Sequence, residues 1–142
     1  MEIKKAETDS EIMKCWEVLF ALRPHLIKEN FIHDVRTTLN DNRQLMFIEE
    51  NGIAVAASIF EWGFNLYRGK YIYIDDLTTL PQARKKGYAS QLLDWIFQYA
   101  EKNEINQIHL DSGSNAGRYD AHRLYLNKGF NITSFHFATP VK

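Results

Sequence analysis

The segment between residues 71 and 102 constrains the fold most. A strand-like apolar stretch, residues 71–80, leads through the basic turn Arg84-Lys85-Lys86-Gly87 into residues at helical spacing. The first N–H groups of a helix have no partner within that helix and can bind an anion. Gly87 leaves out a side chain where a phosphate must come close. The segment therefore predicts a strand, a phosphate cradle and a helix in direct succession.

Three strands in a row are expected before this turn. Residues 44–49 and 53–62 are joined through Asn51-Gly52, which is the strongest short-range signal for a hairpin. Residues 63–69 form a second turn region that leads into residues 71–80. The antiparallel part of the sheet therefore comes first.

Helices and short strands surround these three strands. Thr8 and Glu11 form a capping box for a helix that ends before Pro24. The other expected elements are a strand at 3–6, helices at 26–39, 89–102 and 119–127, and strands at 106–110 and 130–137. This order predicts a single α+β domain over residues 1–142, with a central mixed, mostly antiparallel sheet. The strands on either side of the helix at 89–102 should be parallel neighbours, because a right-handed crossover joins them.

The composition of the chain excludes several classes of function. The formal net charge is −1, so nothing attracts nucleic acid or an anionic membrane in bulk. Cys15 is the only cysteine, which rules out an internal disulfide and favours the cytoplasm. No stretch is long and apolar enough to span a bilayer, and the first residues lack the apolar core of a secretion signal. The histidines are not paired at helical spacing, so no metal site is expected.

Two other phosphate-binding loops are excluded by inspection. Gly69-Lys70 is followed by Tyr71 instead of Ser or Thr, so a Walker A loop is absent. No Gly-x-Gly-x-x-Gly occurs, which excludes the dinucleotide-binding fingerprint. A solvated basic turn is the plain alternative to a phosphate cradle at residues 84–89.

Two motifs resemble those of the GNAT superfamily of N-acetyltransferases. Residues 75–89 resemble its acetyl-CoA motif, Arg/Gln-x-x-Gly-x-Gly/Ala after a strand. Residues 121–130 resemble its Ala-x-x-x-Tyr-x-x-x-Gly-Phe ending. Both motifs come in the family's order, and the element order fits along nearly the whole chain. The resemblance implies a GNAT-like fold, in which one parallel strand pair splays apart between flanking helices.

The resemblance also implies how acetyl-CoA is held. The strand ending at Leu77 and Thr79 would pair its backbone with the pantetheine arm, as if adding a strand. Backbone N–H groups of the cradle and the Arg84 side chain would hold the pyrophosphate. The implied cofactor-binding residues are Leu77, Thr78, Thr79, Arg84, Lys85, Lys86, Gly87, Tyr88, Ala89 and Ser90.

The same resemblance points to an acid and a base. Tyr125 occupies the position where the family often has the general acid for the coenzyme A thiolate, and a core aromatic is the plain alternative. Asp75 and Asp76 are the candidate bases, with Asp76 preferred; a bulge that uses both acids structurally is the alternative. Alternation along a strand puts the two carboxylates on opposite faces, so only one should face the thioester. Base action through a water would also serve.

Three residues are candidates for binding the acceptor. Arg23 and His25 lie between the first two helices, which often frame the acceptor pocket in this family. Asp111 follows the strand that should splay from the cofactor strand, where loops carry function. A charged loop is the alternative for the first pair, and a turn cap for Asp111. Cys15 shares an apolar helical face and is expected to lie in the core.

The chain departs from the family pattern in two places. Arg118 stands where many members have an Asn before the second motif, which puts one usual cofactor contact in doubt. The chain also ends soon after Phe137, whereas members commonly have one further strand. The strand at 130–137 would then expose an edge, which predicts a homodimer through that edge.

The combined reading is a cytoplasmic N-acetyltransferase. It would move the acetyl group of acetyl-CoA to a primary amine of a small molecule or peptide by direct attack, leaving coenzyme A. Two alternatives stay open, namely a non-catalytic acyl-CoA-binding module and a different nucleotide-phosphate binder. No motif identifies the acceptor.

Overall fold

The computed structural model describes residues 2–142 and contains one mixed sheet. Its strands, in spatial order, are β1 (Ile3–Lys5), β2 (Arg43–Glu50), β3 (Ile53–Asn65), β4 (Gly69–Thr79) and β5 (Gln107–Leu110). The first four strands pair antiparallel, and β5 joins β4 in parallel. The predicted α+β fold, with a mostly antiparallel sheet and one parallel pair, is confirmed.

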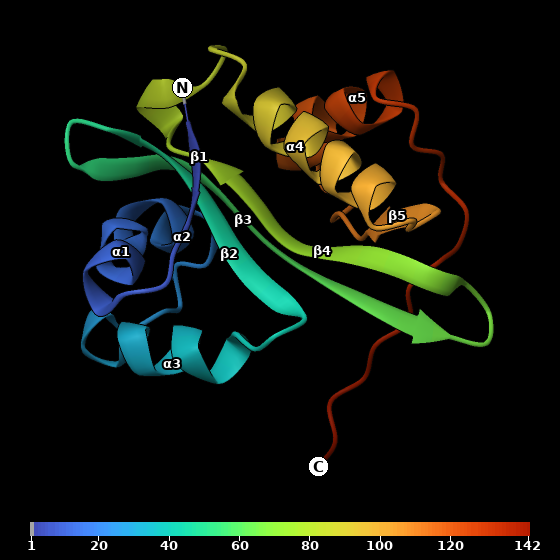
Figure 1. Ribbon diagram of the computed structural model, residues 1–142, viewed down its shortest axis with the longest axis horizontal. Helices are drawn as coiled ribbons and strands as arrows, with labels where there is room; N and C mark the ends of the chain where they lie inside the picture. The colour runs from blue at the N-terminus through green and yellow to red at the C-terminus, as the bar shows by residue number, and fades with distance from the viewer. Residues whose placement is uncertain (1) are drawn as a thin grey trace. The chain divides into compact units, whose positions relative to one another are not determined.

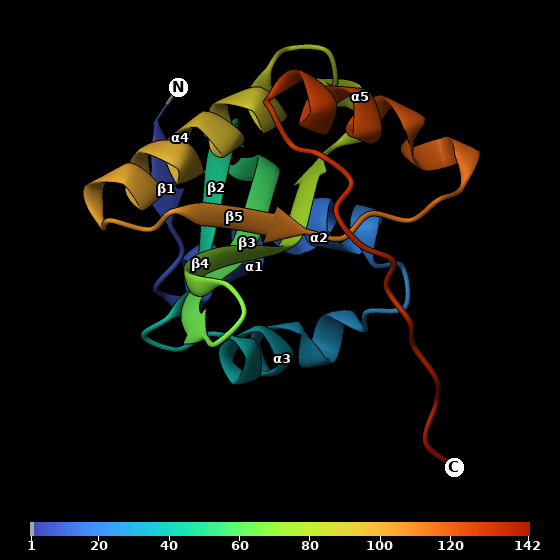
Figure 2. The same ribbon diagram turned by 90° about the vertical axis from the view of Figure 1, so that its right-hand side faces the viewer.

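Helices cover both faces of the antiparallel strands. The helices α1 (Asp9–Lys14), α2 (Trp16–Leu22) and α3 (Phe31–Thr38) lie on one face, and α4 (Tyr88–Lys102) lies on the other, as Figures 1 and 2 show. The last helix is α5 (Tyr119–Asn127). The chain divides into two compact units, one ending at His109 and one running from Leu110 to Lys142.

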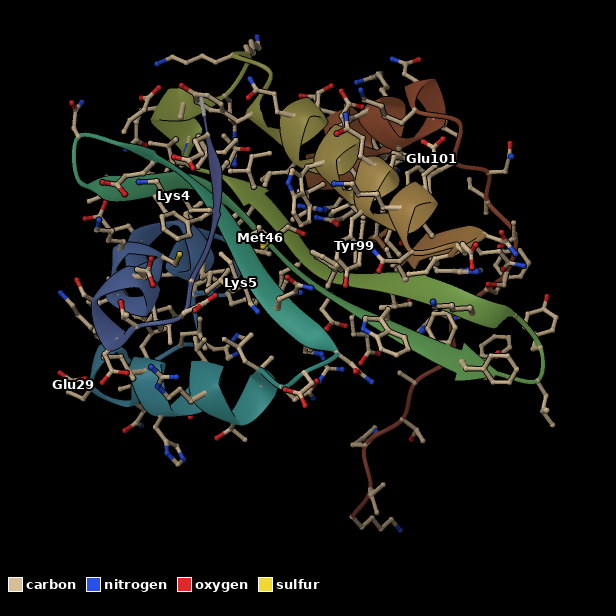
Figure 3. All side chains as sticks on the ribbon, viewed as in Figure 1. Lys4, Lys5, Glu29, Met46, Tyr99 and Glu101 are labelled. Carbon is tan, nitrogen blue, oxygen red and sulfur yellow. The ribbon has the colours of Figure 1, made fainter. Side chains whose placement is uncertain are left out.

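The core of the first unit is built where α4 meets the sheet. The ring of Phe60 in β3 lies 6.0 Å from that of Trp95 and 5.5 Å from that of Tyr99, centroid to centroid. Tyr99 reaches from α4 toward the strands (Figure 3), where its hydroxyl accepts a hydrogen bond from Gln44 at 3.3 Å. Fully burying a side chain such as Phe60 stabilises the fold by about 1.5–3 kcal/mol, and this contact fixes the direction of α4.

The hairpin signals behave as expected at one turn and differently at the next. Asn51 and Gly52 have left-handed φ angles of 53° and 85°, which the tight turn between β2 and β3 requires. Gly63 was predicted in the second turn but lies within β3. A Cβ there would come within 2.9 Å of the Tyr71 hydroxyl, so glycine makes room for that ring across the hairpin.

The helices before β2 are shorter than predicted. The capping box of Thr8 and Glu11 is present, but the helix is interrupted at Cys15, whose N–H bonds to the carbonyl of Ile12. The helix predicted at 26–39 begins only at Phe31. Ile27 before it is extended, and residues 28–30 form a 3-10 turn. The first break separates α1 from α2, and the second leaves a loop between α2 and α3.

The prediction of a strand at residues 130–137 is wrong. Residues 130–142 form no helix or strand in the described chain, and Figure 1 draws them as coil after α5. Ile132, Phe135 and Phe137 are 86%, 85% and 91% exposed. Alternation of apolar residues is insufficient here, because a strand also needs a neighbour for its N–H and C=O groups. The homodimer was predicted through the exposed edge of this strand. Because the strand is absent, the structure does not support that prediction.

Candidate active site

The basic turn before α4 forms a row of free backbone donors. Lys85 and Gly87 have left-handed φ angles of 65° and 84°, and α4 begins at Tyr88. The first helical hydrogen bond runs from the N–H of Gln91 to the carbonyl of Gly87. Within the described residues, no hydrogen bond uses the N–H groups of residues 85–90. The left-handed angle at Gly87 is the local reason for glycine, since other residues adopt it at a cost.

The charge at this helix end favours an anion. The first turn of α4 contains no acidic residue, and no side chain caps it. Arg84, Lys85 and Lys86 are exposed beside it. Free N–H groups, the positive end of the helix dipole and three cations together suit a pyrophosphate.

One edge of β4 can accept an extended ligand. The N–H of Leu80 bonds to the carbonyl of Val55 in β3 at 2.8 Å. N–H groups along a strand point alternately to either side, so those of Leu77 and Thr79 point away from β3. The rings of Tyr71 and His109 are 6.3 Å apart, which sets β5 beside the start of β4. Because β5 ends one residue after His109, it does not reach Leu77 or Thr79.

A side-chain hydrogen bond ties the start of α4 to the sheet. The buried hydroxyl of Tyr88 bonds to the carboxylate of Glu50, the last residue of β2. The cradle residues before Tyr88 are exposed, and Ala89 and Ser90 after it are half-buried. Tyr88 therefore positions the row of donors, a role that the motif does not reveal.

Replacing Tyr88 with phenylalanine is expected to lower the free energy of unfolding by about 1–2 kcal/mol, because Glu50 loses its partner. The affinity for acetyl-CoA should fall as well, since the start of α4 is no longer held. Urea unfolding and acetyl-CoA titration measure the two effects. Tyr67→Phe is the matched control, because Tyr67 is 89% exposed. Equal stability of the two variants would contradict the positioning role.

The two adjacent acids lie on the same face of the sheet. Ile59 pairs with Asp76 and Phe60 with Ile74, so Asp75 is an extra residue, a β-bulge in β4. The bulge cancels the alternation, and both carboxylates share the face of Ile59. The prediction of opposite faces is therefore wrong. The alternation rule fails here because a bulge adds one residue without turning the strand over.

Each acid has its own arginine. The Arg23 Nε and Nη2 atoms lie 2.8 and 2.7 Å from Asp76 Oδ1, and Nη2 also donates to the Asp75 carbonyl at 3.1 Å. The Arg43 Nε atom lies 3.0 Å from Asp75 Oδ2, and its Nη2 lies 2.6 Å from Glu61 Oε2. Arg43 and Glu61 were not singled out in the sequence. Arg43 and Glu61 pair across β2 and β3, and this register is visible only in the structure.

Burial raises the pKa of Asp75 above its usual value. The Arg43 guanidinium opposes this shift in the pKa, while the Glu61 and Asp76 carboxylates add to it. Burial and the two neighbouring carboxylates together therefore outweigh the guanidinium in their effect on the pKa of Asp75.

A pocket opens beside Asp76 in the first unit. Its volume is about 330 Å³. Its walls come from α2, the loop after it, α3, β3 and β4. The lining residues are Leu19, Arg23, His25, Leu26, Phe31, Asp34, Val35, Thr38, Ile59 and Asp76. The structure thus brings together Arg23, His25 and Asp76, which are three of the predicted site residues, and adds Asp34, whose only sequence signal is its helical spacing with Thr38.

The second unit holds the remaining candidates. Tyr125 is buried, and its ring packs 5.9 Å from that of Phe130. Burial raises the pKa of Tyr125 above its usual value, while a hydrogen bond from Arg118 and its charge act in the opposite direction on that pKa. Arg118 therefore contacts Tyr125, which gives this departure from the family pattern a local role. Asp111 lies 3.2 Å from the His136 imidazole.

Cys15 is sealed in the core, as predicted, with none of its surface exposed. Burial raises the pKa of Cys15 to about 12. We expect N-ethylmaleimide to leave the folded protein unlabelled near neutral pH, because the thiolate is the reactive form. Mass spectrometry should find one adduct only after denaturant is added. Rapid labelling of the folded chain would contradict this and would reopen an acyl-carrying role for the thiol.

The described part of the chain has neither a metal-binding cluster nor a membrane-spanning helix. Among residues 2–142, no group of three or more His, Cys, Asp or Glu side chains is arranged to hold a metal ion. In the same residues, no helix is long and apolar enough to cross a membrane.

Known proteins match this chain along its length. The family model described as "Acetyltransferase (GNAT) family" matches residues 6–130. The uncharacterized N-acetyltransferase YhdJ of Bacillus subtilis is 28% identical over 143 residues, which cover 99% of both chains. The aminoalkylphosphonate N-acetyltransferase of Salmonella typhimurium is 31% identical over 100 residues, or 70% of this chain and 64% of that relative.

A solved structure shares the fold. It is the aminoglycoside acetyltransferase AAC(6')-Iy in complex with a bisubstrate analogue, CoA-S-monomethyl-acetylneamine. Its TM-score is 0.82 at 14% identity, covering 99% of this chain and 97% of that one. With the family model spanning most of its residues, the chain belongs to the GNAT acetyltransferase family and is an acetyl-CoA-dependent acyltransferase.

Proposed function

We propose that this protein transfers the acetyl group of acetyl-CoA to the primary amine of a small molecule or peptide by direct attack. One observation carries the proposal. Asp76 lines the pocket, and the next residues of β4, Leu77 to Thr79, present a free backbone edge. An acceptor in the pocket and a thioester arm along that edge would meet at β4.

The cofactor would be held by backbone groups. The outward N–H groups of Leu77 and Thr79 suit the amides of the pantetheine arm, with Thr78 between them turned inward. The side chain of Thr78 lies on the face of the sheet that α2 covers, where its hydroxyl donates to the carbonyl of Val18 at 3.3 Å. The N–H groups of residues 85–90 and the Arg84 side chain suit the pyrophosphate.

The chemistry needs a neutral amine and a protonated leaving group. The ammonium would give one proton through Asp76 to water, and the amine nitrogen then attacks the thioester carbonyl carbon. The C–N bond forms, the C–S bond breaks, and a second proton passes from the nitrogen to water, from which the Tyr125 phenolate regains the proton that it gives up. Tyr125 would donate its proton to the departing thiolate. Its raised pKa keeps that proton in place at neutral pH.

Asp76 is preferred over Asp75 as the residue that meets the amine. Asp76 lines the pocket, whereas Asp75 does not and is held by Arg43. Asp111, which pairs with His136, stays a candidate for a cationic acceptor. The cytoplasmic location and the single-domain organisation also stay predictions.

Replacing Asp76 with asparagine is expected to lower kcat/KM for the amine about tenfold, because the ammonium loses its carboxylate. The KM for acetyl-CoA should not change. Asp75→Asn is the matched comparison, since it makes the same chemical change one residue away and outside the pocket. A larger loss of kcat/KM in Asp75→Asn would reverse the assignment. Steady-state release of free thiol measures both variants.

The function itself is tested by ligand binding and turnover. Acetyl-CoA should raise Tm, and ATP or NAD should not. Thiol release should then accompany acetylation of at least one amine in a panel of polyamines, aminoglycosides, amino acids and N-terminal peptides. Stabilisation by ATP or NAD without acetyl-CoA would refute the cofactor. Binding of acetyl-CoA without acetylation of any amine would support a non-catalytic module.

A further inference from the structure

The pocket beside Asp76 differs in character between its floor and its rim. Four apolar side chains form the floor and are at most 6% exposed, namely Leu19, Phe31, Val35 and Ile59. The charged side chains Arg23 and Asp34 are exposed at the rim, and the half-exposed Leu26 lies beside them. An apolar floor favours a ligand with an apolar body.

One oxygen of the Asp76 carboxylate is left for the ligand. Both contacts from Arg23 go to Oδ1 of Asp76. Among the described residues, no hydrogen bond or ion pair involves Oδ2, although the side chain is only 15% exposed. Oδ2 is therefore a partly exposed oxygen in the pocket wall, where a donor on the ligand can take the place of water. An ammonium group suits this oxygen, because a hydrogen bond between a charged donor and a carboxylate is about twice as strong as one between neutral groups.

The charges oppose an acidic ligand. Arg23 is the only cation of the lining apart from any proton on His25, and its Nε and Nη2 atoms are already used by the two aspartates. With Asp34 and Asp76, the lining carries one formal negative charge more than positive charge. A ligand carboxylate or phosphonate would therefore meet net repulsion and no free bidentate guanidinium.

The size and the charge count also oppose a large polycation. A volume of about 330 Å³ is near the lower end for small-molecule sites. A second ammonium finds a carboxylate only at Asp34 on the rim, and further ones would face the apolar floor.

We infer that the acceptor is a compact monoamine with an apolar body, whose ammonium sits on Oδ2 of Asp76. The inference rests on the proposed acetyltransferase function and names its acceptor class. It separates this chain from its relative that is named for an aminoalkylphosphonate.

The first test compares acceptors by thiol release at fixed acetyl-CoA. The probes are 2-phenylethylamine and 3-methylbutylamine against 2-aminoethylphosphonate, spermidine and kanamycin. The compact monoamines should have the highest kcat/KM, by about tenfold or more, since the other probes leave charges without partners. A higher kcat/KM for the phosphonate, the polyamine or the aminoglycoside would overturn the inference and leave the acetyltransferase function intact.

The second test uses a matched pair of lysine substitutions. Leu26 lines the pocket, and its neighbour Ile27 is 56% exposed and does not. Leu26→Lys should raise the KM for 2-phenylethylamine about tenfold or more through like-charge repulsion, with the KM for acetyl-CoA unchanged. Ile27→Lys should leave both values as in the wild type. Equal effects of the two substitutions would overturn the inference.

Calorimetric titration with 2-phenylethylamine keeps the inference testable without turnover. If no amine is acetylated, the proposed function fails, but binding to the wild type that is lost in Leu26→Lys would still support the pocket assignment. Absence of binding to the wild type would overturn it.

Discussion

Replacing Tyr125 with phenylalanine is expected to lower kcat by about 10²- to 10³-fold, as the loss of a general acid does. Phenylalanine keeps the ring that packs against Phe130 and removes only the hydroxyl. Stability should fall by no more than about 0.5–1.5 kcal/mol, through the lost hydrogen bond from Arg118, and the affinity for acetyl-CoA should change little. Single-turnover acetylation and equilibrium binding of acetyl-CoA measure the two effects separately.

The matched control for Tyr125→Phe is Tyr119→Phe. Tyr119 lies on the same helix and is 50% exposed. Its substitution removes the same hydroxyl group, but at an exposed position. It should keep the wild-type kcat. If Tyr125→Phe also kept it, Tyr125 would be a core aromatic and the thiolate would take its proton from water.

The pH dependence gives a second readout of Tyr125. An acid works while it is protonated, so kcat should fall only as pH rises through the pKa of the folded protein. Burial puts that pKa above 10.0, so no loss due to Tyr125 is expected between about pH 7 and pH 9. A decline of kcat in that window that disappears in Tyr125→Phe would contradict the raised pKa.

The combined substitution Arg84→Ala and Gly87→Ala is expected to weaken acetyl-CoA binding about 10- to 100-fold. Arg84→Ala removes a charge-assisted hydrogen bond to the pyrophosphate. Gly87→Ala puts a Cβ on a residue with a φ of 84°, a conformation that costs other residues about 1–2 kcal/mol. Relief of that strain would turn the backbone donors away from the ligand. The rise in Kd is measured by titration with acetyl-CoA.

Gly69→Ala is the control for the backbone part of this effect. Gly69 has a φ of 72° and, like Gly87, open space where a Cβ would lie. It starts β4 at the hairpin and lies outside the cradle. It should lower stability to a similar extent while leaving the Kd for acetyl-CoA unchanged. Unchanged affinity in the double variant would refute the cradle.

Elements that depend on neighbouring residues were predictable from the sequence. The capping box of Thr8, the Asn51-Gly52 turn and the helix ending before Gly129 all appear where the pattern put them. Each is decided by hydrogen bonds or φ angles within a few residues. The family could be predicted for the same reason, because residues 84–89 and 121–130 are local motifs.

Other predictions failed where contacts with distant residues decide whether a segment forms a strand or a helix. The segment 130–137 has strand-like residues but no neighbour to pair with. The helix predicted at 26–39 loses its first turn, and the loop left there provides Leu26 for the pocket. In both cases the local pattern is present in the residues, but the tertiary surroundings override it.

By itself, the sequence determined the family and the order of strands and helices as far as α5, because these follow from local spacing. Only the tertiary structure decided the geometry of the acids. The bulge at Asp75 turns both carboxylates to one face, where Arg23 and Arg43 reach them from other elements. It also gathered an apolar floor and one free oxygen of Asp76 into a single pocket. Residues so far apart in the chain meet only through packing, so no local pattern could reveal this pocket.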